Sequence, residues 1–552
     1  MAVDAFDELN ERMFKRLLDL KPEVGTVIGL HDPYDMLMPH GGLEDLTGAY
    51  DLLREWRSAA AEVASRQELS LDQSLSMKIL DASIEMLRFA IEDHQMWRMY
   101  PNAVDGIGGL AFIMFSREYA PVESRARGVA ARLKLVPKYL KEFESRFEDG
   151  RPVKLWTEEA IDSCDQVPAF LTFIESAWKG QVSPGTASDL GEGVRAANEA
   201  IKAHKEWLQG LLRTAAPDFA MGRERFERLL KVRGLGMTGD EILRLGEKYL
   251  HDLKAERAAV ADRISGGKGL EEAKRIVEAD CPRTFEEGLE ATRREMESAK
   301  RFIIENEIAT VDESGVLKVV ETPDFLRPLF PYAALMMSSK FDPVQEGAYI
   351  VTRPEDPKDL AKHLNHASII NTAVHEAFPG HFHQGVRSNK RHWMLQLHHM
   401  VSGNDTISTS AETVEGWAHY CEKMMFERGY KATDAAALET LNGAIWRAYR
   451  IIADIKLARG EATVEEMVRF GMEEAGMPRA AAEAEVKRYT HTPGQALSYL
   501  VGRHMLIEFR KDMERELGAA FDEKRFHDLV AGYGYLPMPL MMEGVRAGMK
   551  QG

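Results

Sequence analysis

Apolar residues recur at the spacing of an α-helix over most of this chain, and this pattern restricts it to a mainly α fold. The series Leu80, Ile84 and Leu87, with charged residues between its members, is one example. No segment repeats at a fixed period, which argues against a solenoid of identical units. A chain of 552 residues exceeds what one core usually holds. We therefore expect two helical subdomains, over 1–230 and 231–552.

One region, 316–354, lacks the helical spacing. β-branched and aromatic residues lie between prolines there, so we expect short strands at 316–320 and 348–352, and a small β-sheet beside the helix that follows. Prolines in such runs favour edge strands, and an edge strand can bind an extended peptide by strand addition. A small structural hairpin with no binding role is an equally good interpretation of the same residues.

The charge balance and the cysteines limit the classes of function. Lys and Arg total 71 and Asp and Glu total 88, for a net charge of −17. So acidic a chain is a poor general ligand for nucleic-acid phosphates or anionic membranes. The three cysteines are too few and too far apart for a disulfide framework or a cysteine-rich zinc ribbon. No signal-peptide pattern opens the sequence, and no apolar run reaches the ~20 residues of a membrane span. We expect a cytoplasmic protein that binds neither nucleic acid nor membrane.

The segment H-E-A-F-P-G-H at 375–381 is the most informative part of the sequence. Apolar residues at helical spacing predict a helix that begins at Asp356-Pro357 and ends near Pro379-Gly380. The familiar zinc pattern H-E-x-x-H, which it partly matches, lets two imidazoles four residues apart reach one ion, with the glutamate beside a bound water.

The spacing of the two histidines differs from that pattern. His375 and His381 are six residues apart, which is about 240° around an ideal helix. They can share a metal only if the Pro-Gly pair breaks or bulges the helix and brings His381 back. His383 is a rival second ligand, and a helix that ends in a hydrogen-bonded histidine is the structural alternative.

A second segment, 409–429, predicts a helix with a polar stripe. Thr409 and Glu412 fit a capping box at its start. Glu415, His419 and Glu422 follow at i, i+4 and i+7, on one face and among residues that favour burial. Glu415 is the natural third metal ligand, and His419 and Glu422 can orient the ligands by hydrogen bonds. A solvated polar face is the alternative.

A third segment, 489–503, holds two further candidates. Pro493 is expected to start a helix on which Tyr499 and Arg503 share a face. A tyrosine hydroxyl can donate to a developing oxyanion, and an arginine can bind a carboxylate. The alternative is a tyrosine packed in the core and an arginine on the surface.

These segments, HEAFPGH, EGWAHY at 415–420 and PGQALSYLVGR at 493–503, together resemble the prokaryotic domain-of-unknown-function 885 family. The resemblance covers nearly the whole chain, including GLHDPYD at 29–35 and GYGYLPMPLMMEGV at 532–545. It implies a gluzincin-type zinc metallopeptidase. It also implies an architecture similar to helical thermostable carboxypeptidases and thimet-type oligopeptidases, with two helical subdomains enclosing a deep cleft and the catalytic one at 231–552.

The resemblance also implies roles for individual residues. His375, His381 and Glu415 would hold Zn2+, Glu376 would be the general base, and Tyr499 would stabilise the tetrahedral intermediate. We add His419 and Arg503 to the catalytic candidates. Many family members have a second histidine directly after Pro-Gly-His, where this chain has Phe382, with His383 one residue later.

The leading hypothesis from the sequence is zinc-dependent hydrolysis of peptide bonds in short peptides. One alternative is a metal-dependent hydrolase of a non-peptide amide or ester, because the same residues serve that chemistry. Another is a metal-free helical binding protein that retains the cleft. The expected partner is a short peptide or small amide substrate, and a homodimer is left open.

Overall fold

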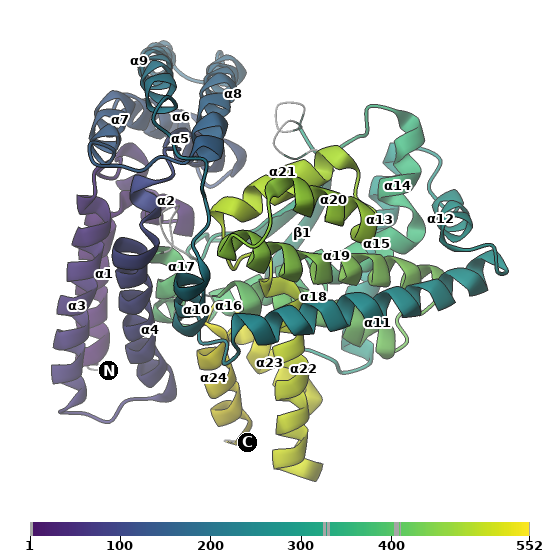
Figure 1. Ribbon diagram of the computed structural model, residues 1–552. Coiled ribbons are helices and arrows are strands. Elements are labelled where there is room, and N and C mark those ends of the chain that lie inside the picture. The colour runs from purple at the N-terminus through teal and green to yellow at the C-terminus, as the bar shows by residue number, and fades with distance from the viewer. Residues whose placement is uncertain are drawn as a thin grey trace. The chain divides into compact units, whose positions relative to one another are not determined.

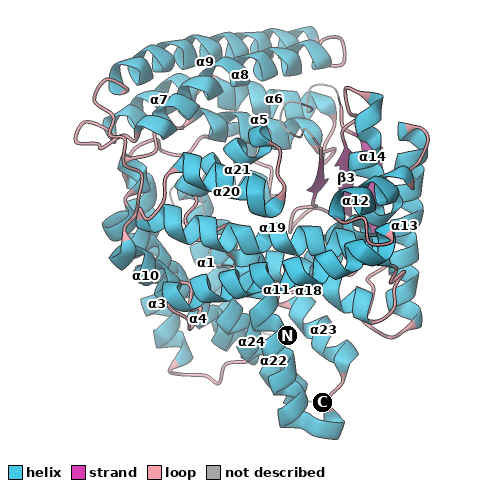
Figure 2. Ribbon diagram, turned by 45° about the vertical axis from the view of Figure 1, so that its right-hand side comes forward, coloured by secondary structure: helices cyan, strands magenta, loops and turns pink. Residues whose placement is uncertain are grey.

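The computed structural model describes residues 4–323, 327, 330, 332–401, 408 and 410–550. The protein is mainly α-helical with one small three-stranded sheet, as the sequence predicts (Figures 1 and 2). Within the described ranges, no helix combines the length and apolar character needed to cross a membrane. The predicted capping residue Thr409 lies outside the described residues.

The chain divides into two compact units. The first extends to Met221 and also takes in Ser339–Asp342 and a segment that begins at Gln396, and the second begins at Gly222. The boundary predicted at 230/231 falls inside α10 (Arg223–Val232). That helix belongs to the second unit and packs against its helices α11 and α19.

The first unit is built from amphipathic helices. Two groups of them pack side by side: α1 with α3 and α3 with α4, and α6 and α8 with α9. Its helices are α1 (Ala5–Leu20), α2 (Pro22–Ile28), α3 (Glu44–Ala64), α4 (Leu71–Arg88), η2 (Phe89–His94), α5 (Val104–Ser116), α6 (Val122–Leu133), α7 (Val136–Ser145), α8 (Lys154–Trp178), α9 (Pro184–Leu211) and α17 (Leu397–Val401), with short 3-10 turns at η1 (Tyr34–Met36) and η3 (Met96–Arg98).

The second unit holds the sheet and all three motif segments. Its N-terminal elements are α10, α11 (Gly239–Ser265), α12 (Leu270–Ala279), α13 (Phe285–Glu305), β1 (Gly315–Glu321), β2 (Ala333–Met336) and β3 (Gln345–Val351). The next are η5 (Pro357–Asp359), α14 (Leu360–Leu364), α15 (His366–Thr372), η6 (Ala373–Ala377), α16 (His381–Asn389) and η7 (Trp393–Gln396). The last are α18 (Ala411–Glu427), α19 (Asp434–Arg459), α20 (Val464–Ala475), α21 (Arg479–His491), α22 (Ser498–Leu517), η8 (Gly518–Ala520), α23 (Glu523–Gly532) and α24 (Met538–Lys550). The long helices α11 and α19 run alongside one another (Figure 1).

The sheet has the order β1-β3-β2. β1 pairs with β3 in parallel, from Gly315 opposite Gln345 to Glu321 opposite Val351, and β2 pairs with β3 antiparallel. The strand predicted at 348–352 is therefore the central strand, and the hairpin interpretation of the two predicted strands is wrong because they run parallel. β2, which the sequence did not indicate, forms one edge.

Helices α18 and α22 cross at two glycines, one from each of the last two motifs. A Cβ on Gly502 would lie 2.2 Å from the carbonyl oxygen of Glu412, and one on Gly416 would lie 2.6 Å from the backbone of Gly502. Only glycine permits backbones to approach this closely. This crossing decides which residues of α18 are covered.

Helix α22 begins at Ser498, five residues later than the start predicted at Pro493. The Asp454 carboxylate accepts hydrogen bonds from the N–H groups of Gly494 (2.7 Å) and Leu497 (2.9 Å) and holds the segment between them in a turn. Gly494 has φ +83°, which a helix cannot include.

Candidate metal centre

The histidine-glutamate pair of the 375–381 motif lies on a widened helical turn. The helix predicted over 357–378 is divided into η5, α14, α15 and η6, since Asn365 caps α15 by accepting from the Ser368 N–H at 2.8 Å. η6 is a π-helix in which the Phe378 N–H donates to the Ala373 carbonyl at 3.0 Å. An inserted residue of this kind rotates the residues after it relative to an α-helix.

The chain leaves this turn at Gly380 and starts a new helix at His381. A Cβ on residue 380 would lie 1.8 Å from the carbonyl oxygen of His375, so no other residue type fits the turn as it stands. The prediction that the helix breaks or bulges near Pro379-Gly380 is confirmed. The two histidines therefore come from two different elements, η6 and α16.

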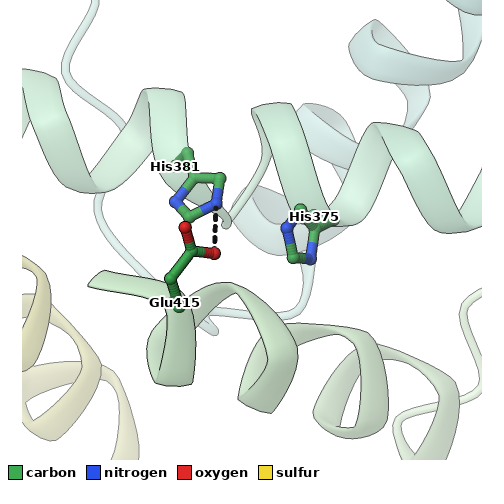
Figure 3. Close-up of side chains that lie close together, drawn as sticks. All are labelled: His375, His381 and Glu415. Carbon is green, nitrogen blue, oxygen red and sulfur yellow. Dashed lines mark ion pairs between the residues drawn. The ribbon is translucent and has the colours of Figure 1, made fainter. Parts of the chain in front are cut away.

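His375, His381 and Glu415 form a group that we call the ligand cluster. Each offers one ligand atom, and these atoms all lie within 4.8 Å of one another. His381 Nε2 lies 3.4 Å from Glu415 Oε2, and the two imidazole rings are perpendicular, with centroids 4.8 Å apart. Figure 3 shows His381 and Glu415 pointing toward one another, with His375 beside them.

These separations fit a metal ion. Ligand atoms about 2.0–2.1 Å from a tetrahedral zinc lie ~3.4 Å from each other, which matches the His381–Glu415 contact. The ligand atom of His375 lies within 4.8 Å of the other two. The rival ligand His383 is not part of the cluster, because it is 2% exposed and its ring lies against Phe378, with centroids 6.4 Å apart.

Glu422 supports the cluster from behind. Its Oε1 lies 2.6 Å from Nδ1 of His375, which leaves Nε2 of that ring for a ligand. Burial favours the neutral acid, but Arg447, whose Nη2 lies 3.3 Å from Oε1, and His375 together lower the pKa of Glu422. A carboxylate that fixes a ligating imidazole in this way is usual in metal sites. The sequence predicted this orienting role for Glu422.

The electrostatics of the cluster keep its carboxylate ionised. Burial disfavours the charged form of Glu415, but the hydrogen bond from His381 and the charges of the two histidines lower its pKa to about 2. Burial likewise disfavours a charged His381, and Glu415 together with Glu376 raises the pKa of that imidazole. Ionised Glu415 is the form that a cation needs.

The ligand cluster lies in a pocket of about 990 Å³ within the second unit, which we call the central pocket. Glu376 and Tyr499 also line it. Glu376 contributes to the raised pKa of His381, so its carboxylate is close to the cluster. One wall is a stripe of helix α19 that includes Glu439, Trp446 and Arg447, and another is the edge strand β2.

His419 and Arg503, two of the predicted catalytic residues, are not among the residues that line the central pocket. They contact each other, with Arg503 Nη1 2.9 Å from His419 Nε2, and both are buried. The structure thus places both residues outside the lining of the central pocket, for a physical reason. α22 packs onto α18 at the Gly416–Gly502 crossing and covers His419, although His419 shares a helix face with Glu415.

The sequence interpretation missed the residues of α19. Six of them line the central pocket: Glu439, Asn442, Gly443, Trp446, Arg447 and Arg450. They recur at the 3–4-residue spacing of one helix face, so a polar stripe in an otherwise apolar helix was the signal that could have found them. What that signal lacks is any indication that the stripe faces the 375–381 motif.

Comparisons with known proteins identify a family and similar structures, and none of these has a stated activity. The model of the family described as "Bacterial protein of unknown function (DUF885)" matches residues 22–545. The chain is similar to the structure of a "putative lipoprotein of unknown function from Shewanella oneidensis", with 21% identity, coverage of 98% of this chain and 99% of that one, and a TM-score of 0.78. It is also similar to that of a "putative lipoprotein from Colwellia psychrerythraea", with 16% identity, 99% coverage of both chains and a TM-score of 0.79. No curated protein matches. These likenesses show a shared fold.

Proposed function

The chain belongs to the DUF885 family of bacterial proteins, and we propose that it is a zinc-dependent, gluzincin-like hydrolase that cleaves peptide bonds in short peptides. The observation that carries this proposal is the ligand cluster. Its two imidazoles and one carboxylate come from η6, α16 and α18 and converge in one pocket beside Glu376.

The donor set favours zinc. Three protein ligands of the His-His-Glu type with an open side toward a pocket are typical of catalytic zinc sites. Such an ion supplies a Lewis acid that polarises a carbonyl and makes water a nucleophile near neutral pH. Glu422 holds the His375 ring in the orientation that leaves Nε2 free.

Two residues of the chain would do the proton chemistry. Glu376 lines the central pocket next to the ligand cluster, so it can take a proton from the attacking water and return it to the leaving amine. Burial and the charge of Glu415 raise the pKa of Tyr499. The phenol therefore stays protonated at neutral pH and can donate a hydrogen bond to the carbonyl oxygen as charge develops there.

The edge strand β2 supports a peptide as the substrate. Ala333 and Leu335 of β2 line the central pocket, and among the described strands β2 pairs only with β3. An extended peptide can add to such an edge through backbone hydrogen bonds. A small ester or amide has no backbone to pair in this way.

Metal analysis and peptide hydrolysis test the proposal together. We expect about one zinc per chain in wild type, and little in His375→Ala. We also expect Glu376→Gln to keep its zinc and to lose ~10²–10⁴-fold in kcat. Arg263→Gln, which changes an exposed ion pair with Asp434, serves as the control for expression and handling.

The outcomes separate the alternatives. Unchanged turnover in Glu376→Gln would refute the mechanism. A zinc-loaded protein that hydrolyses esters or non-peptide amides but no peptide would favour the other hydrolase, and a chain that binds no zinc would favour a binding protein.

A further inference from the structure

Arg447 stands out among the pocket residues because its charge is only partly balanced. Its side chain is 13% exposed, and the one ion pair it makes with a described residue is with Glu422, from Nη2 at 3.3 Å. That carboxylate oxygen also bonds His375 at 2.6 Å, so the acid is shared between two groups.

Among the described residues, the outer nitrogen Nη1 of Arg447 makes no hydrogen bond and the inner nitrogen Nε is buried without a partner, although the side chain lines the central pocket. Gly443 leaves the room for it, because a Cβ on residue 443 would lie 2.7 Å from Nη1. A guanidinium has five N–H donors in a planar fork. In Arg447, donors of that fork remain available to a ligand in the pocket.

The neighbouring Arg450 provides a contrast on the same helix face. Its Nε donates to the Tyr489 hydroxyl and its Nη2 to Glu485, each at 2.9 Å. Its guanidinium also stacks on Trp446, with Cζ 4.4 Å from the ring centroid. Arg450 therefore has two hydrogen bonds and a close ring contact, whereas Arg447 has one ion pair with a described residue and a more distant ring contact, with Cζ 5.8 Å from the Tyr499 centroid.

The location of Arg447 indicates which anion it would meet. It touches Glu422, which touches the ligand His375, so the guanidinium lies close behind the proposed site of bond cleavage. One residue of extended peptide spans about 3.3–3.6 Å. An anion at Arg447 would then be separated from the scissile carbonyl by only one or two residues. The anion that every unmodified peptide carries so close to a cleavable bond is its own C-terminal carboxylate.

We infer that Arg447 binds the C-terminal carboxylate of the substrate, so that the enzyme removes one or two residues from the C-terminal end of short peptides. This inference rests on the proposed peptide hydrolysis and adds the exopeptidase specificity to it. The side-chain carboxylate of a final Asp or Glu has the same chemistry, and the experiment distinguishes it from the terminal carboxylate.

The experiment uses full-length, zinc-loaded protein and three versions of one short peptide. The first has a free C-terminal acid, the second a C-terminal amide, and the third a C-terminal amide with Asp as the last residue. For wild type we expect kcat/KM for the free acid to exceed that for the plain amide by ~10–100-fold, as a charge-assisted hydrogen bond permits. Mass spectrometry should show single residues or dipeptides released from the C-terminal end.

Two variants test the assignment to Arg447, and the measured quantity is the acid-to-amide ratio of kcat/KM. Arg447→Gln should bring the ratio close to one. Gly443→Ala keeps every charge but displaces the guanidinium, so it should lower the ratio as well. The control is Arg263→Gln, which changes an exposed ion pair with Asp434 outside the lining of the central pocket and should keep the wild-type ratio. Zinc content is measured for each variant, because Arg447 also contacts Glu422.

Each result has one reading. A wild type that cleaves acid and amide equally, or that cuts peptides far from their C-terminus, overturns the inference and leaves the proposed function intact. If wild type cleaves the free acid and the Asp amide at equal rates, and Arg447→Gln loses both activities, Arg447 binds side-chain carboxylates as well as the C-terminal one. That result also overturns the inference. An acid-to-amide ratio of kcat/KM that stays at the wild-type value in Arg447→Gln overturns the inference too. A zinc-loaded wild type that cleaves no peptide refutes the proposed function itself.

Discussion

Replacement of Glu422 by glutamine tests whether the contact behind His375 supports metal binding. Glu422 Oε1 lies 2.6 Å from His375 Nδ1, and the Glu422 side chain is fully buried. Glutamine keeps the shape and can still accept a hydrogen bond, but it removes the negative charge that strengthens the imidazole as a ligand. Loss of such a partner typically weakens metal affinity 10–100-fold. We therefore expect the zinc Kd to rise by that factor, or about 1.4–2.7 kcal/mol of binding free energy.

The assay is competition for zinc against a chromogenic chelator at pH 7.5, on protein shown to be folded by circular dichroism. Glu412→Gln is the matched control, because Glu412 is a fully buried glutamate of the same helix, with Arg233 Nη2 2.5 Å from its Oε1. Breaking that pair leaves an uncompensated buried charge and should lower the free energy of unfolding by about 3–5 kcal/mol. The zinc Kd of the folded control should stay at the wild-type value.

The comparison decides the matter in either direction. If folded Glu422→Gln binds zinc with wild-type affinity, Glu422 does not support the ligand cluster. If Glu412→Gln weakens zinc binding as much as Glu422→Gln does, the effect is a general consequence of disturbing α18, and the reasoning from the His375 contact fails.

Two further changes test the turn and the pocket wall. Gly380→Ala places a Cβ 1.8 Å from the His375 carbonyl oxygen. It should lower the free energy of unfolding by about 1–3 kcal/mol and weaken zinc binding, as measured by denaturation and by competition with a chelator. The control is Gly185→Ala, whose Cβ would have no neighbouring atom within 4 Å, and it should show neither effect. Burial and the charge of Glu278 raise the pKa of Glu439 from 4.5 to about 7, so the folded state holds this proton more tightly and stability falls as the pH rises from 5 through 7. Glutamine cannot titrate, so Glu439→Gln should lose about 1–3 kcal/mol of this pH dependence. Urea titrations at several pH values measure the stability of both proteins. If stability falls with pH equally in wild type and variant, Glu439 is not the group responsible.

The fold class and the ligand cluster could be predicted because both depend on short segments. Helical spacing is visible within one or two turns, and His375, His381 and Glu415 lie in two motifs whose residue types suit a metal. The irregular turn was also accessible, since a Pro-Gly pair cannot continue a helix. In each of these segments, the residues that determine the local structure or bind the metal lie within one short motif.

The roles of His419 and Arg503 could not be predicted in the same way. Spacing places His419 on the face of Glu415, but a helix face is wide enough to meet two different neighbours. Gly502 of α22 touches α18 at Gly416 and covers one part of that face, and the central pocket occupies another part. The close approach of α18 and α22, two helices far apart in the chain, decides which part of the face is covered and which part lines the pocket. A single sequence does not show that approach.

A side-chain contact links the two motifs that supply the ligand cluster. The indole Nε1 of Trp417 donates to the carbonyl oxygen of Pro379 at 2.8 Å, and Trp417 is fully buried. Trp417 follows Glu415 by two residues, and Pro379 precedes His381 by two. One hydrogen bond thus fixes the α18 backbone against the turn that carries His381, at a distance along each segment short enough to set how Glu415 meets the imidazole. The tryptophan of EGWAHY and the proline of HEAFPGH therefore have a common physical role, to bring a carboxylate and two imidazoles from separate elements to one point.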